Sequence, residues 1–160
     1  MVGFDLHGER AWTGAAGPAG RLRMRKPSLL IVDDEAHLTL LYEEELKEAG
    51  FAVDVAHTHA EAFALLSARD YDCLIVEPAA LKPGELETLR GHFAWHRNTK
   101  LLFNTTSLRA GTELTARFGA DGCIVKSSDI TLLNERIRKL LASPTFMDHR
   151  TNDHRECIHA

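Results

Sequence analysis

The sequence has few cysteines, no long apolar run and no excess of positive charge. Its 160 residues include three widely spaced cysteines, an odd number that does not indicate a disulfide-rich scaffold. No apolar run reaches the roughly 18 residues that a membrane span needs, and the N-terminus lacks the apolar stretch of a secretory signal. We therefore expect a cytoplasmic protein with no membrane partner.

The net charge of -4 gives no reason to expect nucleic acid as a partner. The chain is 44% hydrophobic and 26% charged, a composition that suits one domain with a real core. Cys73 and Cys123 lie in apolar, strand-like runs. We predict that both are unreactive thiols in that core.

The two ends of the chain differ from its middle. Residues 1–26 are poor in aliphatic side chains and rich in Gly, Ala and Arg, which predicts a disordered N-terminal arm with solvated arginines. Residues 143–160 are polar and predict a flexible C-terminal tail. The predicted domain is 27–142. Met24 stands just before it and is an alternative to Met1 as the start of translation.

Between the arms, short apolar runs alternate with segments of helical periodicity. Such alternation is typical of an α/β fold in which a parallel sheet is covered by helices on both faces. The predicted strands lie near 28–32, 51–55, 73–76, 100–103 and 122–125, and the predicted helices near 38–49, 58–66, 85–93, 111–118 and 130–141.

Four of the predicted strands are followed by side chains that suit phosphate or metal chemistry. They are the acid pair Asp33 and Asp34, then Glu77, then Thr105, then Lys126. In open α/β sheets, ligands bind beyond the carboxyl ends of the strands. Clustered carboxylates suit Mg²⁺, and a hydroxyl with an ammonium group suits the oxygens of a phosphoryl group.

These motifs resemble the CheY-like receiver domains of response regulators. Leu30-Ile-Val-Asp-Asp-Glu35 is similar to the family's first strand and acid pair. Gly119-Ala-Asp-Gly-Cys-Ile-Val-Lys126 resembles the segment that carries the family's lysine, and Glu77 stands near the position of its phosphoacceptor aspartate. The resemblance covers about three quarters of the chain. It implies a doubly wound, flavodoxin-like sheet of five parallel strands in the order 2-1-3-4-5.

The resemblance also implies roles for the residues at the strand ends. Asp33 and Asp34 would hold Mg²⁺, together with the backbone carbonyl near Ala79. Thr105 would sense the phosphoryl group, and Lys126 would pair with the central carboxylate.

Four departures from the family pattern weaken the expectation of phosphorylation. The phosphoacceptor aspartate is replaced by Glu77, and the usual prolines four residues later and after the lysine are Leu81 and Ser127. The switch aromatic is Cys123. Glutamate carries its carboxylate about 1.5 Å further out, and phosphoryl chemistry tolerates a misplacement of about 1 Å poorly. We expect a phosphorylation-independent receiver, with Mg²⁺ bound weakly or not at all.

Plainer interpretations of the same residues stay open. Asp33 and Asp34 also suit the start of a helix, a salt bridge from Glu77 to Lys126 needs no signalling role, and threonines are common in turns. Counting back from Lys126 without a gap places Asn104, rather than Thr105, at the switch position. His92 and His96 have the i, i+4 spacing of a possible metal pair, but no third ligand is evident nearby, so we interpret them as part of a solvated face. The spacing of the tail residues fits no standard zinc site; they are His149, His154, Cys157 and His159.

We predict a stand-alone response regulator of two-component, or phosphorelay, signalling that is not an enzyme. No room is left after residue 142 for a DNA-binding domain, so we expect output by contact with a sensor kinase, a downstream signalling protein or a second copy of the chain. The family's usual contact face corresponds to residues 111–141. The alternatives are phosphotransfer at a non-standard residue and a purely structural adaptor.

Overall fold

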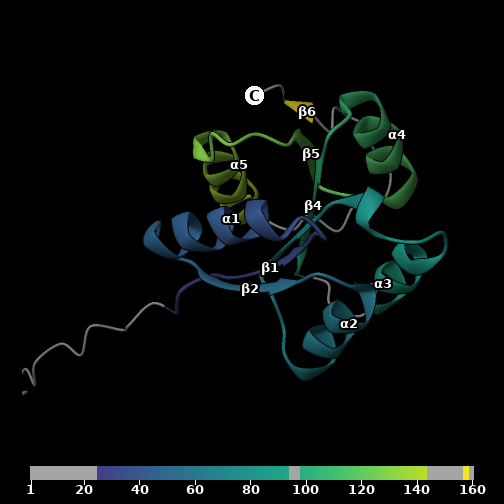
Figure 1. Ribbon diagram of the computed structural model, residues 1–160, viewed down its shortest axis with the longest axis horizontal. Coiled ribbons are helices and arrows are strands. Elements are labelled where there is room, and N and C mark those ends of the chain that lie inside the picture. Colours follow the sequence, from purple (N-terminus) through teal and green to yellow (C-terminus); the bar gives the residue numbers. More distant parts are fainter. Residues whose placement is uncertain (1–24, 94–97, 144–156, 159–160) are drawn as a thin grey trace, which may run out of the picture.

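The computed structural model describes residues 25–93, 98–143 and 157–158. Its strands and helices alternate along the chain (Figure 1). The strands are β1 (Ser28–Val32), β2 (Ala52–Ala56), β3 (Cys73–Val76), β4 (Lys100–Thr105), β5 (Gly122–Val125) and β6 (Cys157–Ile158). The helices are α1 (Ala36–Glu48), α2 (His59–Ala68), α3 (Glu85–Phe93), α4 (Leu108–Phe118) and α5 (Thr131–Ala142), with a 3-10 turn at Pro78–Ala80.

The strands form one parallel sheet in the order β2-β1-β3-β4-β5-β6. The predicted order of the first five strands, 2-1-3-4-5, is confirmed. The chain crosses from one half of the sheet to the other between β1 and β3, which are hydrogen-bonded neighbours. The carboxyl ends of these two strands therefore border the crevice in which such sheets bind ligands.

Helices cover both faces of the sheet, as Figure 1 shows. Alternate residues of each strand point to opposite faces, so Leu29 and Ile31 pack under α1 and α5. Leu30 and Val32 pack under α2, α3 and α4. All five residues of β1 are buried, as expected for a central strand whose two faces are both covered.

Local signals in the sequence fix several helix ends. The Thr58 hydroxyl accepts a hydrogen bond from the Glu61 N–H at 3.2 Å and so caps the start of α2. Gly119 ends α4 with φ of 69°, a left-handed conformation that costs glycine little. No helix among the described residues is long and apolar enough to cross a membrane.

The short strand β6 was not predicted. Its two residues pair in parallel with β5, with the backbone of Cys157 opposite that of Cys123. Cys123 is disulfide-bonded, so the prediction of a free core thiol is wrong at this position. Cys73 is a free, buried thiol, as predicted, and burial raises its pKa above the ordinary value.

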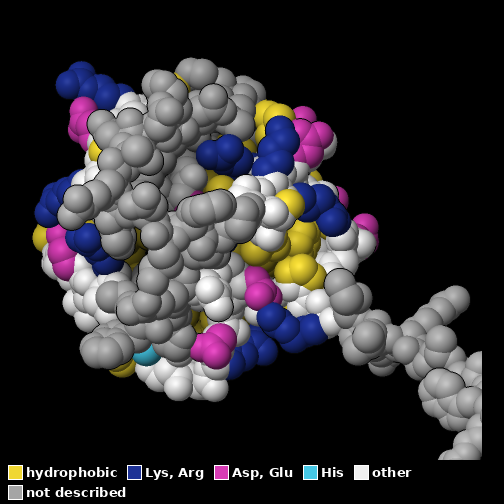
Figure 2. All heavy atoms as spheres, turned by 180° about the vertical axis from the view of Figure 1, so that it is seen from behind, with side chains coloured by type: hydrophobic (Ala, Val, Ile, Leu, Met, Phe, Trp, Pro, Cys, Tyr) yellow, Lys and Arg dark blue, Asp and Glu magenta, His cyan; other side chains and the backbone are white. Residues whose placement is uncertain are grey.

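Charges of both signs are mixed on the surface. Over the coloured part of the face in Figure 2, Lys and Arg side chains lie among Asp and Glu side chains, with apolar side chains between them. No single sign of charge dominates this part of the surface.

Candidate functional site

The predicted site residues extend the strands at the carboxyl edge of the sheet. The Glu77 N–H donates to the Val32 carbonyl at 2.9 Å, and the Lys126 N–H donates to the Thr105 carbonyl at 2.8 Å. Both residues thus prolong the hydrogen-bond ladder beyond the last strand residues. Their backbones are consequently fixed by the sheet rather than by loops.

The ammonium group of Lys126 lies between two buried carboxylates. Its Nζ atom is 2.7 Å from Asp33 Oδ2 and 3.3 Å from Glu77 Oε2, and it reaches Glu35 Oε2 at 3.5 Å. The Lys126 side chain is 10% exposed, and those of Asp33 and Glu77 are 2% and 3% exposed. Because burying unpaired charges is costly, this cation holds the ends of β1, β3 and β5 together.

The remaining oxygens of the two buried acids accept backbone hydrogen bonds. Asp33 Oδ1 accepts from the Glu35 N–H at 3.0 Å, and Glu77 Oε1 accepts from the Ala79 N–H at 3.0 Å. The bond from the Glu35 N–H stands directly before α1, so Asp33 also orders the start of that helix. Each carboxylate is thus held on one side by backbone and on the other by Lys126.

The charges around Lys126 stabilise its protonated form. Burial lowers the pKa of Lys126, but the contact with Asp33 and the negative charges of Asp33 and Glu77 outweigh burial. The pKa therefore lies above the ordinary value for lysine, and the side chain is a cation throughout the physiological pH range.

The structure does not bring the predicted magnesium pair together. Asp33 is buried, whereas Asp34 is exposed and makes no hydrogen bond or ion pair with another described residue. Near Ala79 it is the N–H group, directed at Glu77, that takes part in the site. Within 25–93, 98–143 and 157–158, no three Asp, Glu, His or Cys side chains are grouped so as to hold a metal ion. The arrangement of these residues does not fit Mg²⁺.

Thr105 and Asn104 point to opposite faces of the sheet. Thr105 is 4% exposed, and its Oγ1 accepts a weak hydrogen bond from the Ser107 N–H at 3.4 Å. Asn104 hydrogen-bonds to the Tyr42 hydroxyl on the face covered by α1. Thr105 therefore shares a cavity with Glu77, whereas Asn104 does not.

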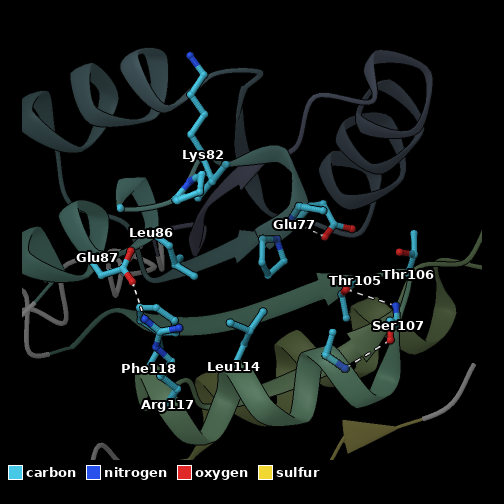
Figure 3. A pocket seen from close by; sticks show the side chains of 16 residues that line it. Glu77, Lys82, Leu86, Glu87, Thr105, Thr106, Ser107, Leu114, Arg117 and Phe118 are labelled. Atoms are coloured by element: carbon cyan, nitrogen blue, oxygen red, sulfur yellow. Dashed lines mark hydrogen bonds and ion pairs between the residues drawn. The ribbon is translucent and has the colours of Figure 1, made fainter.

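This cavity, of about 440 Å³, lies between the segment that follows β3 and helix α4 (Figure 3). Glu77 and Thr105 stand at one end, and the ion pair of Glu87 with Arg117, at 3.0 Å, stands at the other. Apolar side chains, including Leu86, Leu114 and Phe118, line the space between them. The cavity is thus polar at its ends and apolar in its middle.

Sequence reasoning missed three residues that shape the site. Glu35 extends the acid pair by one position, and its proximity to Lys126 depends on how α1 begins. The buried Tyr42 hydroxyl donates to the Ser127 carbonyl at 3.0 Å and so connects α1 to the residue after Lys126. Gly111 brings α4 close to Thr105, because a Cβ atom there would lie 2.8 Å from Thr105 Cγ2.

The histidine interpretations are tested only in part. The interpretation of His92 as a solvated side chain is wrong: the ring is half-buried against α2, with Nε2 3.1 Å from the Leu66 carbonyl oxygen and an edge contact with Phe63. His96 and the tail residues His149, His154 and His159 lie outside the described residues.

Comparison with known proteins gives sequence relatives and many similar structures, although no family model matches the chain. The transcriptional regulatory protein CpxR of Escherichia coli K12 is 28% identical over 125 residues, which cover 78% of this chain and 53% of CpxR. CpxR of Klebsiella pneumoniae is 31% identical over 113 residues, which cover 71% of this chain and 48% of that protein. The chain thus spans about half the length of the curated relatives it matches.

Solved structures match the domain over nearly their full length. The response regulator TrrA of Thermotoga maritima, crystallised with Mg²⁺-BeF, is 29% identical with a TM-score of 0.60, and the match covers 71% of this chain and 98% of TrrA. The chain contains a response regulator receiver domain. A second Thermotoga maritima response regulator, 23% identical with a TM-score of 0.66 over 74% of this chain and all of that one, supports the CheY-like fold. The replacement of the receiver's aspartate by Glu77 stays an interpretation from the sequence motifs.

Proposed function

We propose that this receiver domain serves two-component signalling without being phosphorylated and acts by protein contact rather than by catalysis. The observation that carries the proposal is the state of the Glu77 carboxylate. One of its oxygens accepts the Ala79 N–H, and the other lies 3.3 Å from Lys126 Nζ. With 3% of its side chain exposed, Glu77 is shielded from a phosphoryl donor in solution, and its Oε2, which accepts no hydrogen bond within the described residues, faces the Lys126 ammonium.

Phosphoryl transfer makes demands that this geometry does not meet. The attacking oxygen has to approach phosphorus in line, and cations have to neutralise the charge that develops on the transferred group. The Lys126 cation is already neutralised by Asp33 and Glu77. The longer side chain of glutamate also places the carboxylate about 1.5 Å further from the backbone than aspartate does.

The same contacts favour one constant state of the domain. Glu77 places a permanent negative charge beside Lys126, as a phosphorylated aspartate would, although a phosphoryl group carries more charge and more acceptor oxygens. We propose that the domain presents a fixed surface, formed by residues 111–141, to a sensor kinase, a downstream signalling protein or a second copy of itself in the cytoplasm.

Incubation of the full chain with a small phosphodonor and Mg²⁺, followed by intact mass spectrometry, tests this proposal. We expect no stable phosphoryl adduct. Hydrogen exchange of α4 and β5 is expected to be the same with and without the donor. An adduct that forms on the wild-type chain and disappears in the Glu77→Gln variant would overturn phosphorylation independence.

A structural adaptor without an active state is the second candidate. It is favoured by the shorter contact, 2.7 Å, that Lys126 makes with Asp33 rather than with Glu77. The Glu77→Ala variant separates the two candidates. A locked signalling state predicts that this change alters hydrogen exchange in α4 and β5 beyond the global loss of stability, whereas an adaptor predicts the global loss alone.

A further inference from the structure

At the carboxyl edge of the sheet, Asp33 Oδ2 and Glu77 Oε2 accept no hydrogen bond within the described part of the chain, and the Lys126 ammonium is the ion-pair partner of both. Each of Asp33 and Glu77 uses one oxygen to accept a backbone N–H at 3.0 Å and the other to contact Lys126 Nζ. The carboxylate of Glu35 approaches the same ammonium from the solvent side at 3.5 Å. Three carboxylates from two strand ends and the start of α1 thus surround a single cation.

A magnesium ion that used these carboxylates would have to take the position of that ammonium group. Mg²⁺ binds oxygens at about 2.0–2.1 Å in octahedral geometry. An ion in contact with both Asp33 Oδ2 and Glu77 Oε2 would lie in the space where Lys126 Nζ stands, 2.7 and 3.3 Å from these atoms. Two positive charges at such a separation repel each other strongly in a buried site. An ion bound between these two oxygens would therefore have to displace the ammonium group.

The other carboxylate oxygens at this edge of the sheet do not form a magnesium site either. Asp33 Oδ1 already accepts one hydrogen bond, from the Glu35 N–H at 3.0 Å. Asp34 is exposed, and no third Asp, Glu, His or Cys within the described part of the chain joins it in a metal-binding group. A single exposed carboxylate holds Mg²⁺ weakly, because this ion gives up its water reluctantly.

We infer that the Lys126 ammonium group is the resident cation of this site and that the protein takes up no Mg²⁺ there at the concentrations found in cells. The state of the domain is then independent of magnesium as well as of phosphate. The inference does not rest on the proposed function, since a site without metal is compatible with signalling or with an adaptor role.

The test compares the thermal stability of three full-length chains with and without Mg²⁺. The wild-type chain is expected to show no change in Tm up to about 10 mM Mg²⁺, because a ligand stabilises only the state that binds it. The Lys126→Met variant leaves two buried carboxylates without a cation. We expect it to gain a Tm that rises with Mg²⁺ concentration, with an apparent affinity at least about tenfold tighter than that of the wild type.

Lys100→Met is the matched control. The Lys100 residue is also buried, and its ammonium lies 3.8 Å from Asp121 at the opposite edge of the sheet, where β4 begins. Its loss lowers stability without creating a cation site, so Mg²⁺ is expected to leave its Tm unchanged.

A second measurement keeps the inference testable if Lys126→Met does not fold without metal. Mn²⁺ broadens the amide signals of residues near its site in nuclear magnetic resonance spectra. In the wild-type chain, we expect the signals of Glu77, Ala79 and Lys126 to stay sharp at Mn²⁺ concentrations of about 1 mM. Saturable broadening of these signals, or a wild-type Tm that rises with Mg²⁺ as steeply as that of Lys126→Met, would overturn the inference. Neither result bears on whether Glu77 accepts phosphate.

Discussion

Replacing Gly111 by alanine tests how closely α4 lies on the sheet. The added methyl group would stand 2.8 Å from Thr105 Cγ2 and 3.2 Å from Cys123 Cβ and Sγ. Both neighbours are buried, at 4% and 0% exposure, and Thr105 is β-branched, so neither side chain moves aside easily. Overpacking of this kind costs about 1–3 kcal/mol.

Helix propensity acts in the opposite direction. Alanine in place of glycine inside a helix stabilises by about 1 kcal/mol. The net expectation for Gly111→Ala is therefore a free energy of unfolding lower by about 1 kcal/mol, with the steric effect the larger of the two. Urea unfolding followed by circular dichroism measures this quantity.

Gly91→Ala provides the control for propensity alone. Gly91 lies in the last turn of α3, and a Cβ atom there would meet no described atom within 4 Å beyond its chain neighbours and the backbone of its own helix. We expect this variant to be more stable than the wild type by about 0.5–1 kcal/mol. If Gly111→Ala proves as stabilising as Gly91→Ala, then α4 does not lie against Thr105 as described, and the reasoning about the cavity beside it fails.

Three further changes test the contacts around the sheet. Tyr42→Phe removes the hydrogen bond to the Ser127 carbonyl and is expected to cost about 1 kcal/mol, measured by urea unfolding. Burial raises the pKa of Asp72, but hydrogen bonds from Ser28 and Arg25 outweigh burial and hold this pKa below its ordinary 3.8. The ionised Asp72 therefore stabilises the folded state fully above pH 3.8, and this contribution is lost as the pH falls through the lower folded pKa. Asp72→Asn should therefore flatten the acid limb of a stability–pH curve. The pKa of Lys126 is raised above 10.5, so the protonated side chain stabilises the folded state fully below that pH, and this contribution is lost as the pH rises through the higher folded pKa. The free energy of unfolding of Lys126→Met should not show this decrease at alkaline pH.

Periodicity in the sequence was sufficient to predict the five main strands and the chemistry at their ends. Continuous apolar runs such as 28–32 form only when both faces of a strand are covered, so they predicted a parallel sheet directly. The cap at Thr58 and the left-handed conformation of Gly119 depend on residues that are close in the chain, so contacts with distant segments are not needed to form them.

Contacts between distant segments could not be predicted in this way. The sequence presents Asp33 and Asp34 as equals, yet one is buried against Lys126 and the other is exposed, because the turn into α1 orients only the first toward the sheet edge. The buried side chains of α1 include the polar Thr39 and Tyr42 beside Leu46, and apolar periodicity alone does not identify the first two. The strand β6 depends on a pairing with β5 that no local pattern encodes.

The position of Lys126 in the chain has a consequence during protein synthesis. A ribosome releases Asp33 first, Glu77 later and Lys126 last of the three, and domains fold as their segments emerge. Until β5 has left the ribosome, the nascent β1 and β3 present two carboxylates at one edge with no cation between them. Because like charges oppose burial, that edge stays open to water while the chain is still growing. The ammonium group that joins these two carboxylates in the finished domain is thus the last of the three charges to be synthesised.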